Sequence, residues 1–164
     1  NYQLSPENFH PLSGEAAGRR HHGFGPLLAL LAVEEYLDFT PWEGFRFGLI
    51  SPEEEGLISR VAIQGRHYDV SVSRKEIILQ EEGRPIITID GGAVVRHFLY
   101  AENEVSFEIQ SMAGRRLRIE FLRKGKYQLL IDNIPKRVFT GRRVKFDVPD
   151  GSHAVLLQLL EALD

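Results

Sequence analysis

The chain has 164 residues with a formal net charge of −3 at pH 7; 43% of its residues are hydrophobic and 26% are charged. This composition is typical of a folded globular protein, and the small negative charge gives no general attraction to nucleic acid or to anionic membranes. Cysteine is absent, which excludes disulfides, thiol nucleophiles and cysteine-bound zinc.

The ends and apolar runs of the chain say little about its location. The longest apolar run, Pro26 to Val33, is far too short to span a bilayer, and the polar first residues show no secretory signal. Met112 is the only methionine, so we expect the chain to be a processed product or a fragment. We expect no membrane, no nucleic-acid partner, no metal and no other cofactor, and we favour the cytoplasm.

The first distinctive segment is residues 7–18, ENFHPLSGEAAG, which carries Glu7 and Glu15 around a turn rich in Pro, Ser and Gly. It is either a functional loop or only a turn that leads into the fold. The next segment sets His21 beside His22. Neighbouring histidines point in different directions and make a poor metal pair. We interpret them as a solvated basic loop, with contact to sugar hydroxyls as the second choice.

The following segment, GPLLALLAVEEYLD, predicts one apolar α-helix from about Pro26 to Leu37. Proline suits the first helical turn, and leucine and alanine are strong helix formers. Apolar residues cover much of the helix circumference, so most of its faces require burial. We therefore expect an uncovered apolar patch, which would contact the rest of a larger protein or another copy of the chain.

The segment TPWEGFRFG ends the helix and holds Trp42, Phe45 and Phe47. Such an aromatic cluster most often fills the joint between a helix and a sheet. The alternative is that Trp42 stacks on a sugar ring, because its face is apolar and its N–H can donate a hydrogen bond.

From about residue 45 the pattern of apolar residues has a period of two, which is typical of β-strands. Alternate positions carry Val61, Ile63, Tyr68, Val70, Val72, Val105, Phe107, Ile109, Leu117, Ile119, Phe121, Val144, Phe146 and Val148. Turn signals recur at QGRH, EEGRP, DGG, MAGR, RKGK, TGR and PDGS. The basic stretch RRLRIEFLRKGK is interpreted as the solvated face of a hairpin whose charge is offset by acidic strands. The ambiguous segment 153–159 is predicted to be a strand.

These patterns predict a mainly β protein, with an antiparallel β-sandwich preceded by one apolar α-helix. We place the domain boundary after residue 42. Residues 1–42 would form the opening loop and the helix, and residues 43–164 the sandwich.

Two regions resemble a known group of enzymes. The opening stretch is similar to the loop before the last helix of (α/α)6-barrel glycosidases, namely family 63 glycoside hydrolases and their trehalase relatives. The matching residues are Glu7, Phe9, Pro11, Ser13, Gly14, Glu15, Gly18 and Phe24. The last strands resemble those of accessory sandwich domains on glycosidases.

This resemblance implies a role for Glu7. An inverting glycosidase uses one carboxylic acid to protonate the leaving oxygen and one carboxylate to activate water. Glu7 would be that general base, and the general acid would come from sequence upstream. Glu15, His21, His22 and Trp42 would contact the carbohydrate or shape the loop.

We therefore expect the C-terminal fragment or subunit of a glycoside hydrolase, in which the sandwich buttresses a helical catalytic barrel. The chain would have no activity alone. The alternative is a separate β-sandwich binding or assembly module without catalysis, in which Glu7 is a solvated carboxylate in a turn.

Overall fold

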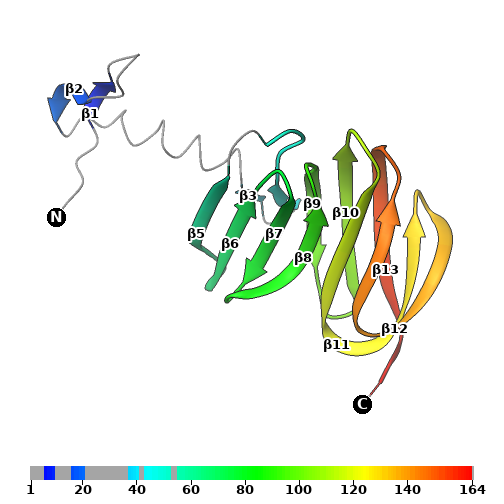
Figure 1. The fold of residues 1–164 in the computed structure, drawn as a ribbon. Coiled ribbons are helices and arrows are strands. Elements are labelled where there is room, and N and C mark those ends of the chain that lie inside the picture. Colours follow the sequence, from blue (N-terminus) through cyan, green and yellow to red (C-terminus); the bar gives the residue numbers. More distant parts are fainter. Residues whose placement is uncertain (1–5, 10–15, 21–36, 41–42, 53–54, 164) are drawn as a thin grey trace. The chain divides into compact units, whose positions relative to one another are not determined.

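The computed structural model describes residues 6–9, 16–20, 37–40, 43–52 and 55–163, which form strands and turns but no helix (Figure 1). The chain divides into two compact units, residues 1–35 and 36–164, and each is described by itself. The expected boundary after residue 42 stays a prediction, because 41 and 42 lie outside the described residues. The expected helix also lies outside them, except for its last residue, Leu37, which begins a strand.

The first unit contains one antiparallel hairpin. Strand β1 (Pro6–Phe9) pairs with β2 (Ala16–Arg20), with Asn8 opposite Ala17 and Phe9 opposite Ala16. The register shifts between Pro6 and Asn8. The described part of the opening stretch is therefore strand.

The second unit is built from eleven strands. They are β3 (Leu37–Thr40), β4 (Gly44–Phe47), β5 (Gly56–Ile63), β6 (Arg66–Val72), β7 (Glu76–Glu81), β8 (Arg84–Asp90), β9 (Val94–Tyr100), β10 (Glu104–Ser111), β11 (Arg115–Ile131), β12 (Ile134–Val148) and β13 (Gly151–Ala162). Segment 153–159 lies in β13, so its assignment as a strand is confirmed. Among the described residues, no helix is long and apolar enough to cross a membrane.

All eleven strands belong to one antiparallel sheet, in the order β3-β4-β9-β10-β13-β11-β8-β7-β6-β5, with β12 paired to β11. The prediction of mainly antiparallel β structure is confirmed. The sheet is strongly curled, and Figure 1 shows β5, β6, β7 and β8 forming one flank of the curl. Strands β4, β9, β10 and β13 form the other flank. In a sandwich, the two facing layers belong to separate sheets. Here both facing layers belong to one curled sheet.

The long strand β11 joins the two flanks, and β12 pairs with it along its length. The first half of β11 pairs with β8, and its second half pairs with β13. Gly125 lies opposite Gly141 where the register of the β11–β12 ladder shifts. The sequence patterns predicted turns at RKGK and TGR, and this prediction is wrong. Both segments lie inside β11 and β12, where the missing side chains allow the ribbon to bend.

Apolar side chains from both flanks meet in one core cluster inside the curl. The alternating residues of β6, β10 and β11 are buried, as their period-two pattern predicted. The rings of Phe45 and Tyr68, from opposite flanks, are 4.6 Å apart between centroids. Phe45 and Phe47 are both buried, which confirms core packing for these two residues.

The basic stretch in β11 has the role that its alternation predicted. Arg116 Nε lies 2.9 Å from Asp147 Oδ1, and Lys126 Nζ lies 2.6 Å from Glu161 Oε2. These partners belong to the neighbouring strands β12 and β13. The outward side chains of β11 are thus solvated and offset by acidic neighbours.

Candidate ligand-binding pocket

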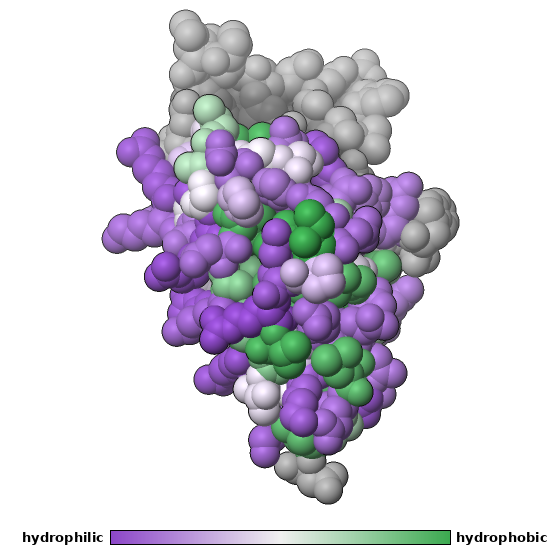
Figure 2. All heavy atoms as spheres, turned by 90° about the vertical axis from the view of Figure 1, so that its right-hand side faces the viewer, coloured by the Kyte–Doolittle hydropathy of each residue, from purple (hydrophilic) through white to green (hydrophobic). Residues whose placement is uncertain are grey.

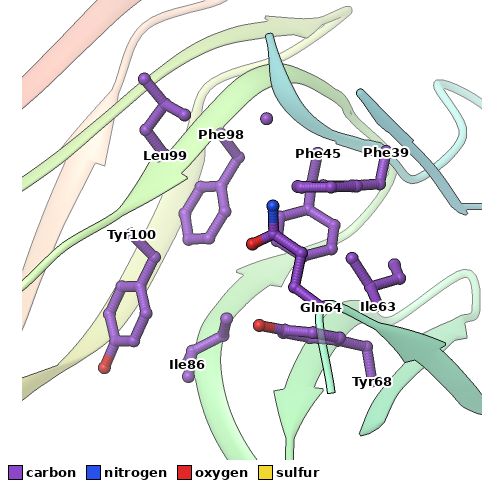
Figure 3. Close-up of a pocket in the computed structure, with 10 residues that line it drawn as sticks. Phe39, Phe45, Ile63, Gln64, Tyr68, Ile86, Phe98, Leu99 and Tyr100 are labelled. Carbon is purple, nitrogen blue, oxygen red and sulfur yellow. The ribbon is translucent and has the colours of Figure 1, made fainter. Parts of the chain in front are cut away.

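A pocket of about 170 Å³ lies where the two flanks of the curled sheet face each other. Five aromatic side chains line it, together with aliphatic side chains and one amide (Figure 3). The lining residues come from six strands and one turn: Phe39, Gly44, Phe45, Ile63, Gln64, Tyr68, Ile86, Phe98, Leu99 and Tyr100. Residues far apart in sequence therefore meet here because the sheet curls.

The aromatic rings pack against one another and hold the pocket in shape. The centroid of Phe45 lies 4.8 Å from that of Phe39, and the two rings are tilted by 48°. Phe98 stacks on Tyr100 with a centroid distance of 6.2 Å. Such contacts add about 0.5–1.5 kcal/mol each beyond the burial of apolar area. The wall is preformed and presents aromatic surface to an occupant.

The phenol of Tyr68 is fixed by a carboxylate behind the wall. Its hydroxyl donates to Glu81 Oε1 at 2.8 Å, and Arg66 Nη1 lies 2.7 Å from the same oxygen. Burial, followed by the hydrogen bond to Glu81, raises the pKa of Tyr68 to about 12. The ring is neutral in ordinary conditions, and its oxygen can still accept a hydrogen bond.

The phenol of Tyr100 is held in a similar way. Its hydroxyl donates to the backbone carbonyl of Glu120 at 2.6 Å. Burial is the main cause that raises the pKa of Tyr100 well above its usual range. This phenol is therefore also neutral, with its proton already engaged.

Gln64 supplies the amide of the pocket. It lies with Gly65 in the two-residue turn between β5 and β6, and both residues have positive φ, 49° and 79°. This geometry is that of a type I′ hairpin turn. Its side chain extends among the pocket rings in Figure 3 and makes no hydrogen bond with another described residue. The amide is available as both donor and acceptor.

Gly44 allows β4 to approach β9 closely at the pocket wall. Its φ is +78°, and a Cβ at this position would lie 2.5 Å from the carbonyl oxygen of Phe98. A larger residue would push the strands apart and distort the wall. The glycine is thus required by the local geometry.

The polar side chains in the described lining of the pocket are one amide and two phenols whose protons are already engaged. Among the described residues that line it there is no carboxylate, histidine or lysine. A cavity of about 150 Å³ holds one benzene ring, so the space suits one six-membered ring. The lining offers aromatic faces, one amide and two phenolic acceptors.

His153 and Asp132 form a second group of polar side chains. Their hydrogen bonds indicate a structural role. His153 Nδ1 lies 2.7 Å from Asp132 Oδ2, and Nε2 lies 2.9 Å from the Asp150 carbonyl oxygen. Both ring nitrogens are therefore engaged, which leaves none to act as a base. His153 thus links the β11–β12 turn, through Asp132, to the β12–β13 turn, through the Asp150 carbonyl.

The site residues expected from the sequence lie largely outside what the structure describes. Glu7 lies in β1, whose backbone alone is described, so its role as a base stays a prediction. Glu15, His21, His22 and Trp42 lie outside the described residues. Their expected contacts with carbohydrate also stay predictions.

The pocket was not predicted from the sequence. The sequence patterns placed Phe45 in the core and Tyr68 in an alternating strand, and they did not distinguish Gln64, Phe98 or Tyr100. The aromatic pair two positions apart in HFLY was a usable signal, because residues i and i+2 share one face of a strand. Nothing in the sequence indicated that this face would meet the β5–β6 turn.

Within the described ranges, no group of three or more His, Asp or Glu side chains is placed to hold a metal ion. Comparison of the chain with protein-family models, with curated proteins and with solved structures found no match.

Proposed function

We propose that residues 36–164 form a non-catalytic binding module of a carbohydrate-active protein, and that the aromatic pocket holds one sugar ring. The observation that carries the proposal is the pocket itself, in which aromatic faces surround an amide that makes no hydrogen bond with another described residue. A pyranose has apolar C–H faces and hydroxyl edges. Aromatic rings cover such faces, and a few polar groups fix the orientation.

The polar groups of the pocket set how the sugar is held. The phenols of Tyr68 and Tyr100 donate to Glu81 and to the Glu120 carbonyl, so they can only accept from the ligand. Gln64 is the group that can both donate and accept. Recognition of a hydroxyl pair therefore depends mainly on Gln64.

A variant of Gln64 tests this proposal. Gln64→Asn keeps an amide and suits the positive φ, but its side chain is one methylene shorter and reaches less far into the pocket. We expect binding of methyl glycosides to weaken about fivefold, which corresponds to one lost hydrogen bond. Glu82→Asn is the matched control, because Glu82 has the same φ of 49° in the β7–β8 turn, outside the pocket lining.

Isothermal titration with a panel of methyl glycosides gives the affinities. Loss of affinity in Gln64→Asn but not in Glu82→Asn supports the proposal. No binding by the unmodified chain, or equal affinity of both variants, would reject it.

A second proposal concerns the opening stretch, and the similarity of residues 7–24 to a glycosidase loop supports it. In this proposal the chain is the C-terminal part of a glycoside hydrolase, and Glu7 is the base that activates water. General base catalysis contributes about 10²–10⁴-fold, so Glu7→Gln should lower turnover of a complete enzyme by that factor. Glu15→Gln should lower it less. Near-normal turnover by Glu7→Gln would leave the binding-module proposal as the better one.

A further inference from the structure

A groove separate from the aromatic pocket lies along the concave side of the bent strand β12. Its volume is about 570 Å³. Leu129, Ile131 and Phe146 form its buried floor, and the half-buried Phe139 extends it. Figure 2 views the right-hand side of Figure 1, where β12 lies, and shows patches of apolar side chains among hydrophilic ones. The groove has room for several side chains of a bound chain.

The rim of this groove carries three cations, Lys136, Arg137 and Lys145. None of them lies within ion-pair distance of a carboxylate among the described residues, although the charge of Lys136 contributes to the lowered pKa of Asp132. The guanidinium of Arg137 instead lies 5.0 Å from the ring centre of Phe139. Its position over an aromatic face keeps the charge at the entrance.

The acidic side chains of the rim already have partners. Asp132 Oδ2 lies 2.7 Å from His153 Nδ1, and Asp147 Oδ1 lies 2.9 Å from Arg116 Nε. The rim is therefore positive in balance, over an apolar floor. An occupant with carboxylates and apolar side chains complements both features.

Strand β12 also offers backbone groups. In the sheet it pairs with β11 alone, so among the described strands its other edge is unpaired. The ladder is regular from Arg137 to Thr140, whereas Pro135 and a register shift between Leu129 and Leu130 interrupt it nearer the turn. An unpaired edge of this kind can accept an extended peptide as an added strand.

We propose that this groove binds an extended acidic peptide of a partner protein. The peptide adds to β12 between Arg137 and Thr140, its carboxylates pair with the unpaired cations, and its apolar side chains pack on Phe139 and Phe146. The site is independent of the aromatic pocket and of the carbohydrate proposal.

The test measures binding of a fluorescent peptide that alternates glutamate and valine. We expect saturable binding that weakens as salt is added, because the pairs at the rim are solvent-exposed. Lys136→Glu combined with Lys145→Glu should lower the affinity at least about tenfold. The matched control is Lys75→Glu with Arg84→Glu, which changes the net charge equally at exposed positions outside the groove. Bound peptide should also slow amide exchange in residues 137–140.

Three results would overturn the proposal. They are absence of peptide binding, equal loss of affinity in the control pair, and binding without added protection of residues 137–140. If no peptide binds, the role of the rim cations and of the register shift beside Pro135 would be to protect an exposed sheet edge from pairing with other chains. Binding of phosphatidylserine vesicles with no binding of the peptide would assign the surface to membranes instead.

Discussion

At the scale of single residues, a few side chains have functions that their neighbours define. Gln64 supplies a free amide because the turn that carries it ends beside the aromatic rings. Tyr68 and Tyr100 present acceptor oxygens because their hydroxyl groups already donate hydrogen bonds to Glu81 and to the Glu120 carbonyl. Neither property follows from residue type alone.

The His153–Asp132 pair predicts a dependence of stability on pH. The pKa of His153 is raised above its usual value, mainly by the hydrogen bond to Asp132 and secondly by the hydrogen bond to the Asp150 carbonyl. A group whose pKa is raised in the folded state stabilises the fold below its unfolded pKa, about 6.5, and loses that effect as the pH rises through the folded pKa. The pKa of Asp132 is lowered, mainly by the bond to His153, so its contribution is lost only in acid.

The variant His153→Gln removes the titrating group. We expect urea unfolding of the unmodified chain to show a midpoint that falls as the pH rises above about 6.5, and the variant to show a smaller fall. A difference between the two midpoints that stays constant over this range would contradict the assignment.

At the scale of elements, the bends in β11 and β12 determine how the sheet curls. Gly125 and Gly141 lie opposite each other in the ladder. A Cβ on Gly125 would lie 2.4 Å from Leu159 Cδ1, and Gly141 has a φ of +135°. Two different constraints, close contact and backbone conformation, therefore favour glycine at the two positions.

We predict that Gly141→Ala destabilises the fold by about 1–3 kcal/mol, because an alanine there is held in a strained conformation. Gly114→Ala is the control, since its new Cβ would be 3.6 Å from the Val148 carbonyl oxygen and its φ is not positive. That variant should stay within about 0.5 kcal/mol of the original chain. The free energy of unfolding in urea gives both values. Equal stability of the two variants would show that the bend does not depend on Gly141.

At the scale of the whole molecule, the sequence predicted the strands better than their arrangement. The period-two pattern identified the buried residues of β6, β10 and β11, because a strand with one solvated face alternates. It passed over β8 and β9, which carry consecutive buried residues such as Ile86 and Ile87. It also passed over β7, although burial alternates in that strand. It also took RKGK and TGR for turns, because glycine beside charged residues is equally typical of turns and of bends within long strands.

The candidate pocket depended on information that a local pattern does not contain. Its residues come from β3, β4, β5, β6, β8, β9 and the β5–β6 turn, and they meet because β11 carries the sheet from one flank to the other. The opening residues that the sequence singled out, Glu7 above all, belong to the other unit. Their function is a separate question with its own test.

The central claim is that the aromatic pocket binds a sugar ring, and NMR titration tests it most directly. A methyl glycoside of about 13 non-hydrogen atoms at about −0.3 kcal/mol per atom would bind with a dissociation constant of about 1 mM. We predict that methyl glycosides produce saturable shifts confined to signals of pocket residues such as Phe45, Tyr68 and Tyr100. Shifts elsewhere, or none well above about 1 mM, would contradict the claim. Saturable shifts with phenol but with no glycoside would retain the pocket and reject carbohydrate as its ligand.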